Sequence, residues 1–126
     1  MVVKFTIGQT GQVITGVPRG SLTRAQVATH AGVVPNAVGD MPAGIVMDDK
    51  PTDSPPLMCD LASVGCWVED TSLNMNVETD LVYSDGDGTW STAEPAGAAG
   101  TKVWVLGVPI APTIFRLTIT PHEKGA

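Results

Sequence analysis

The side chains best suited to catalysis are few in this chain of 126 residues, and they lie far apart in its sequence. His30 and His122 are separated by most of the chain, and Cys59 and Cys66 lie between them. Hydrolytic chemistry needs a nucleophile, a base and an orienting acid within reach of one another. The sequence contains no nucleophile-elbow motif and no phosphate-binding glycine loop. We therefore expect a protein that is not an enzyme and that binds no cofactor.

The two cysteines, Cys59 and Cys66, allow either a disulfide or a pair of free thiols. A reducing compartment favours free thiols, which then fill small core positions. A zinc site would require both histidines to reach the cysteines from distant segments, and none of the short paired ligand spacings is present. We expect two free buried thiols and no metal site.

Asp85 and Asp87 lie in the stretch Asp-Gly-Asp-Gly, which raises the hypothesis of a calcium site. If Asp85 is position 1 of an EF-hand loop, Ala96 falls at position 12, where a bidentate glutamate is required. The EF-hand interpretation therefore fails. Glycine supplies positive φ angles and aspartate caps its own turn, so the stretch predicts a tight β-hairpin instead.

A second acidic cluster consists of Asp48, Asp49 and Asp53, and Lys50 and Pro51 interrupt it. Clustered carboxylates can bind Ca²⁺, but these have no fixed ligand spacing. We interpret the cluster as a solvated acidic loop.

Composition and charge exclude several classes of partner. The net charge is −6, and the seven Lys and Arg residues are scattered, whereas nucleic-acid binding needs clustered cations. The sequence has no apolar run of about 18 residues and no signal-peptide core, so we expect no membrane partner and synthesis in a cytoplasm. The 14 glycines and 10 prolines favour short strands joined by turns.

Alternation of apolar and polar residues predicts a series of short strands. Residues 1–7 and 12–15 predict an N-terminal hairpin within residues 1–20, or an arm that adds to a neighbouring subunit's sheet. Residues 69–79 fit either a strand or an extended loop. The run 102–108 is apolar on both faces and predicts a central strand. Further strands are expected at 44–47, 57–61, 66–69, 81–84, 89–92 and 114–119.

Residues 23–31 carry the one helix signal. Thr23 and Gln26 fit a capping box, Ala25 and Val27 belong to an apolar stripe, and Gly32 provides a C-terminal stop. We therefore expect a mainly β single domain over residues 1–126. It should be a small β-barrel or β-sandwich of short antiparallel strands, with one short helix near residues 23–31.

The chain resembles the small β-barrel head-decoration, or cement, proteins of tailed bacteriophages in the order GIVMDDKP, LASVGCWVE, TDLVYSDGDGTWSTAEP, KVWVLGVPI and FRLTI. Like them, it places two glycine-containing strands before the hairpin and an apolar strand and an alternating strand after it. The resemblance covers residues 42–121 and implies that they form a β-barrel core. Residues 1–40 lie outside it.

The resemblance implies a structural role. Such proteins bind the outside of an expanded phage capsid, often as trimers, and brace neighbouring capsomers. It therefore implies the major capsid protein as partner, a homotrimer, and a place on the exterior of a virion assembled in the host cytoplasm.

Aromatic side chains are common anchors at such interfaces, so the expected interface residues are Phe5, Trp90 and Trp104, with Asp85 and Asp87 at the hairpin tip. For each tryptophan, ordinary core filling is the alternative.

A second class of function is a carbohydrate-binding or fibre-tip module. In that class, exposed Trp67, Trp90 or Tyr83 would stack on sugar rings. Another virion structural subunit, such as a tail-tube or head–tail joining protein, is a further alternative.

Overall fold

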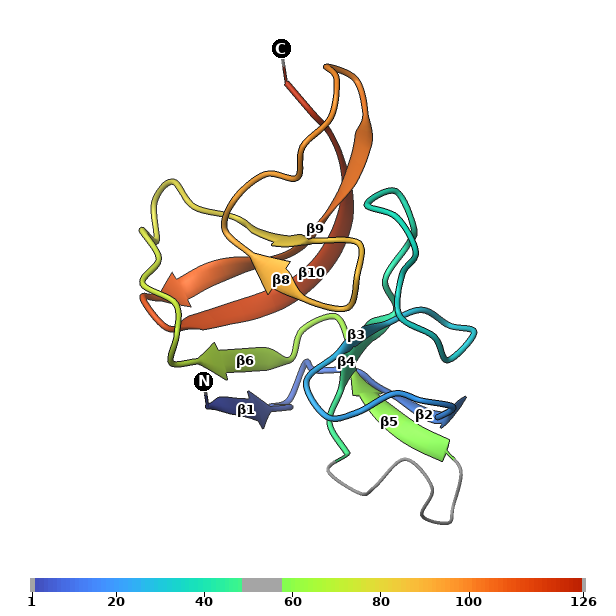
Figure 1. Cartoon of the computed structure of the whole chain (residues 1–126). Helices are drawn as coiled ribbons and strands as arrows, with labels where there is room; N and C mark the ends of the chain where they lie inside the picture. Colours follow the sequence, from blue (N-terminus) through green and yellow to red (C-terminus); the bar gives the residue numbers. More distant parts are fainter. Residues whose placement is uncertain (1, 49–57, 126) are drawn as a thin grey trace.

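The structure, a computed structural model, describes residues 2–48 and 58–125, and these form ten β-strands and no helix (Figure 1). One antiparallel sheet has six strands in the order β1-β6-β10-β9-β7-β8 and curves into a half-barrel. The other has four strands in the order β2-β5-β4-β3. The mainly β prediction is confirmed. In chain order the strands are β1 (Val3–Thr6), β2 (Val13–Pro18), β3 (Val27–Ala28), β4 (Gly44–Val46), β5 (Met58–Ala62), β6 (Trp67–Asp70), β7 (Val82–Ser84), β8 (Trp90–Ser91), β9 (Lys102–Ala111) and β10 (Ile114–Glu123).

The main core lies between the two sheets. Val27 and Ile45 of the four-stranded sheet pack in one cluster with Val68, Leu106 and Phe115 of the six-stranded sheet, and all five are fully buried. Successive residues of a strand point to opposite faces, so each strand sends alternate side chains into this layer. The alternation of apolar and polar residues in the sequence therefore indicates which face of each sheet is buried.

Two smaller clusters cover the outer faces. Behind the four-stranded sheet, Leu22 packs against Val46 and Leu61, and all are buried. On the six-stranded sheet, Val103 and Val105 of β9 cluster with Tyr83, partly covered by Val38. Because β9 contributes to two clusters and lies between β10 and β7, the prediction of a central strand at 102–108 is confirmed.

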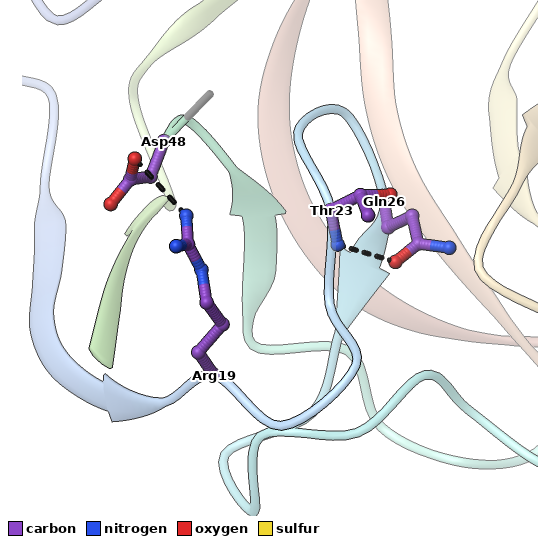
Figure 2. A network of polar contacts seen from close by, with 4 residues as sticks. All are labelled: Arg19, Thr23, Gln26 and Asp48. Carbon is purple, nitrogen blue, oxygen red and sulfur yellow. Dashed lines mark hydrogen bonds and ion pairs between the residues drawn. The ribbon is translucent and has the colours of Figure 1, made fainter. Parts of the chain in front are cut away.

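The short helix expected at residues 23–31 is wrong. Half of the capping box forms, since Gln26 Oε1 accepts a hydrogen bond from the Thr23 N–H at 2.8 Å (Figure 2). The Gln26 N–H bonds back to the Thr23 carbonyl at 3.3 Å, which closes a β-turn. Ala25 has a φ of 68°, in the left-handed region, so the chain cannot continue as a right-handed helix there.

Directly after this turn, pairing with another strand determines the backbone conformation. Val27 and Ala28 form β3 and pair with Ile45 and Gly44 of β4. Val27 enters the core between the sheets, whereas Ala28 enters the cluster behind the four-stranded sheet, and both are fully buried. A strand places two neighbouring residues on opposite faces in this way, and a helix does not. Burial on both sides therefore outweighs a weak local helix signal.

The hairpin expected within residues 1–20 is also wrong. β1 pairs with β6 in one sheet, and β2 pairs with β5 in the other. Residues 7–12 thus carry the chain from one sheet to the other. The segment 69–79 is a strand only as far as Asp70, and beyond it buried Met75 and half-buried Leu73 pack against the core.

A buried ion pair holds the connection between β2 and β3. Arg19 is fully buried, and its Nη2 lies 3.1 Å from Asp48 Oδ1, just beyond β4 (Figure 2). A buried guanidinium is tolerated only when a partner compensates its charge. The interpretation of Asp48 as part of a solvated acidic loop is therefore wrong, and Asp49 and Asp53 lie outside the described residues.

The positive φ of Ala25 gives the first testable prediction. Replacing Ala25 by glycine should raise the free energy of unfolding by about 0.5–1 kcal/mol, because glycine adopts this φ without strain. Urea unfolding followed by circular dichroism measures it. In a helix the same change would lower stability by about 1 kcal/mol, so the sign discriminates between the two conformations. Ala31→Gly, at an exposed position without a positive φ, is the control and should give no gain.

Candidate functional site

Two chain crossings between the sheets lie side by side and are hydrogen-bonded to each other. One is residues 7–12, between β1 and β2, and the other is residues 63–66, between β5 and β6. The Gln12 N–H donates to the Val64 carbonyl at 3.0 Å, and the Ser63 N–H donates to the Gln12 carbonyl at 2.9 Å. The buried Cys66 thiol also donates to the Gln12 carbonyl, at 3.1 Å. These bonds fix the backbone at the junction.

Glycine is required where the crossings touch. Gly65 has a φ of +90°, and a Cβ there would lie 2.4 Å from the Thr10 carbonyl oxygen. The same turn is tied to β10, because the Gly65 N–H donates to the Leu117 carbonyl and the Leu117 N–H donates to the Cys66 carbonyl, both at 2.9 Å. The junction is therefore a close-packed and rigid part of the molecule.

Exposed apolar side chains gather on this rigid junction. Ile7 and Val64 are each 41% exposed and Trp67 is 47% exposed. Adjoining shallow hollows share Thr10 and Gly65, and they connect these side chains with one another and with Arg116. Arg116 lies directly opposite Trp67 in the pairing of β10 with β6. We call this surface the connector patch: Ile7, Thr10, Val64, Gly65, Trp67 and Arg116.

The composition of the connector patch is that of a protein-binding surface. Tryptophan and arginine are enriched among residues that dominate binding energy, and charged residues are depleted at interface centres. No carboxylate is among the six residues of the patch, although the whole chain has a net charge of −6. A partner would therefore meet apolar surface and one cation, without the acidic character of the rest of the chain.

Of the interface residues expected from sequence, Phe5 and Trp104 are mostly covered. Trp104 is 6% exposed and donates its indole N–H to the Gly39 carbonyl at 3.0 Å, as the core-filling alternative predicts. Phe5 is half-buried against the main core, with the Arg24 guanidinium 5.2 Å from its ring centre.

Trp90 is half-buried and rigidly held. Its indole N–H donates to Asp70 Oδ2 at 3.0 Å, and its ring meets the Phe115 ring edge-on, with 6.0 Å between centres. Asp70 is only 2% exposed, and its Oδ1 accepts from the Ser72 N–H at 2.9 Å and from the Ser72 hydroxyl at 2.6 Å. The buried carboxylate thus has donors on both oxygens and fixes the indole.

Asp85 and Asp87 build the hairpin turn, and their prediction as turn formers is confirmed. The Asp85 N–H donates to the Thr89 carbonyl at 3.0 Å, which closes the turn between β7 and β8. Asp87 Oδ1 accepts from the Thr89 hydroxyl at 2.6 Å and the Thr89 N–H at 3.0 Å. Asp85 Oδ1 accepts from the Ser91 hydroxyl at 2.8 Å, and its Oδ2 lies 3.1 Å from the Thr89 hydroxyl oxygen, whose single proton is donated to Asp87. The hydrogen bonds from Thr89 lower the pKa of Asp87 below its ordinary value of 3.8.

A hollow of about 230 Å³ opens beside Trp90, between Ala25, the turn at residues 70–73 and residues 89–92. We call it the Trp90 hollow. Leu73 and Trp90 give it an apolar wall, and its other lining residues are Ala25, Asp70, Ser72, Thr89, Ser91 and Thr92. It is a second concave surface, and its residues are not those of the connector patch.

Among the remaining titratable groups in the described part of the chain, Tyr83 and His122 are neighbours, with 6.0 Å between their ring centres. Cys59 and Cys66 are free and buried, as expected, and burial raises the pKa of both thiols. His30 is exposed, and His122 Nε2 lies 3.9 Å from Glu94 Oε1. Within residues 2–48 and 58–125, no three His, Cys, Asp or Glu side chains are placed to hold a metal ion, and no helix could span a membrane.

Sequence reasoning missed most of the connector patch. Alternation within residues 66–69 sends Val68 inward and Trp67 outward, and Trp67 was expected at a surface only in the carbohydrate-binding alternative. Ile7 and Val64 stand next to glycine turns in segments far apart in the chain. Only the pairing of the two crossings brings them together, and neither segment contains a signal for that pairing.

The chain matches no protein-family model, no curated protein and no solved structure. The two candidate surfaces are therefore defined by geometry and chemistry: the connector patch by exposed apolar side chains on a rigid junction, and the Trp90 hollow by a fixed aromatic ring.

The low pKa of Asp87 makes the hairpin sensitive to acid. A carboxylate whose pKa is lower in the folded state stabilises the fold above its unfolded pKa, and this contribution is lost as the pH falls through the folded pKa. Asp87→Ala should therefore lower the free energy of unfolding by roughly 0.5–1 kcal/mol at pH 7, through the lost hydrogen bonds.

The difference between Asp87→Ala and the parent protein should shrink as the pH falls below about 4, in urea unfolding at each pH. Glu123→Ala, at an exposed position, serves as the control for general charge effects. A difference that stays constant from pH 7 to pH 2.5 would contradict a stabilising charged form of Asp87.

Proposed function

We propose that this protein is a structural virion protein that binds the outer surface of a tailed-phage capsid and stabilises the shell by bridging capsomers. Its partner is the major capsid protein, and it acts as a homotrimer on the exterior of the virion. Two things support this proposal: the resemblance of residues 42–121 to head-decoration proteins, and the exposed apolar connector patch. The connector patch is the main observation in favour of this proposal.

The connector patch suits docking onto a shell for a physical reason. Association costs free energy when loops must be ordered, and a surface that is already rigid avoids much of that cost. Here the apolar side chains of Ile7, Val64 and Trp67 stand on a backbone held by hydrogen bonds between the crossings and to β10. Burial of these side chains can then stabilise the complex without the free-energy cost of first ordering the chain.

Repetition on a symmetric shell can compensate for weak individual contacts. A patch of this size does not need to bind tightly by itself, because linked binding events strengthen one another. A trimer presents three connector patches at once, and closed symmetry is the usual arrangement of homo-oligomers. Many modest contacts can therefore brace neighbouring capsomers.

Two matched substitutions test this proposal. Val64→Asp places a charge in the connector patch, whereas Val77→Asp places the same charge at a position that is 47% exposed and does not line the patch. Desolvating the introduced carboxylate at an interface should weaken binding by about 2 kcal/mol, roughly 30-fold. Co-sedimentation with expanded capsids of the cognate phage should show this loss for Val64→Asp and parent-like binding for Val77→Asp.

The possible results distinguish failure of the proposed docking surface from failure of the proposed function. If Val64→Asp binds expanded capsids as well as the parent protein does, the connector patch is not the docking surface. If the parent protein does not co-sediment with capsids and light scattering shows a strict monomer, the decoration function itself is wrong.

A further inference from the structure

We propose that Arg116, on the connector patch, pairs with a carboxylate of the docking partner, an aspartate or glutamate side chain set among apolar neighbours. This inference rests on the proposed function, because it specifies the group of the capsid protein that meets the patch. Three properties of Arg116 support it: its fixed place in the sheet, the apolar side chains on both sides of it, and the lack of an ion-pair partner in the described residues.

Arg116 has a fixed place in the six-stranded sheet. It lies directly opposite Trp67 of β6 and directly opposite Val108 of β9, so β10 is paired on both sides of it (Figure 1). Residues that lie opposite each other across paired strands share a face of the sheet. The Arg116 side chain is exposed on this face, whereas its chain neighbours Phe115 and Leu117 are fully buried on the other. The backbone that carries the guanidinium is therefore in position before a partner arrives.

Docking on the connector patch would remove water from Arg116. Trp67, which is 47% exposed, and the half-buried Val108 stand on either side of it in the sheet. Val64 lines the same hollow as Arg116. A partner that covers these apolar side chains also covers the guanidinium, and apolar contacts around a polar pair exclude water from it. Arg116 then needs an acceptor in the complex, because an unpaired buried charge is costly.

The protein itself supplies no carboxylate for Arg116. Within the part of the chain that the structure describes, Arg116 forms no ion pair, and no Asp or Glu belongs to the connector patch. Glu69 shares the outer face of β6, but it lies opposite Lys4 on one side and Ile114 on the other. A carboxylate can accept two parallel N–H bonds from a guanidinium, so it matches the shape and the charge of this group. The partner is therefore expected to provide one.

Two substitutions of Arg116 test the pairing by co-sedimentation with expanded capsids of the cognate phage. Arg116→Gln should weaken binding roughly 30-fold, because it leaves the partner's carboxylate buried without a counter-charge. Arg116→Lys keeps the charge but not the two-pronged geometry, and should weaken binding about fivefold. Arg24→Gln, the same change at an exposed position outside the connector patch, should bind as the parent protein does. Urea unfolding shows that each variant is folded. Parent-like binding of folded Arg116→Gln would overturn the inference and leave capsid binding itself intact.

Chemical neutralisation of the capsid identifies the acceptor as a carboxylate. Carbodiimide and glycinamide convert exposed Asp and Glu side chains of the expanded capsid into neutral amides. The parent protein should bind these capsids about tenfold more weakly than untreated ones, whereas Arg116→Gln should lose less than about twofold. No loss for the parent protein, or an equal loss for both proteins, refutes a carboxylate partner. If the parent protein does not bind untreated capsids, the proposed function is wrong, and this inference is refuted with it.

Discussion

The fold depends on how the chain crosses between its two sheets. It does so twice in the described residues, at 7–12 and at 63–66, and each crossing takes the backbone out of a sheet ladder. Backbone groups that leave a ladder need other partners. Here the crossings supply partners for each other through Gln12, Ser63 and Val64, and glycine at position 65 permits the close approach. The sheets can then pack face to face around one core.

The same constraint produces the surface that we assign to binding. Where the chain turns between sheets, inward positions are taken by residues such as Cys66 and Val68, which are fully buried. The nearby Val64 and Trp67 then point outward, and Ile7 of the other crossing lines the same hollow as Trp67. An apolar surface and a rigid backbone thus coincide because both arise from the junction. That coincidence is what a docking surface requires.

Local chemistry determined which parts of this structure were predictable from sequence. The hairpin at residues 85–88 and the strand at 102–108 depend on turn residues and apolar runs that lie within one segment, and both predictions are confirmed. The helix at 23–31 was wrong because pairing of Val27 with β4 decides the conformation there. The connector patch joins two distant crossings, so only its Trp67 had any signal in the sequence.

The acidic residues show how the same side chains can suggest one chemistry and perform another. Asp85 and Asp87 satisfy the donors of a tight turn, and Asp70 does the same for Trp90 and Ser72, so their oxygens are occupied within the fold. An occupied carboxylate still acts on its surroundings, because it orients each hydroxyl that donates to it. Asp70 in this way holds the Trp90 indole and Ser72, and Asp85 and Asp87 hold Ser91 and Thr89 at the hairpin turn. These aspartates therefore act within the fold: they stabilise the hairpin turn and orient neighbouring side chains.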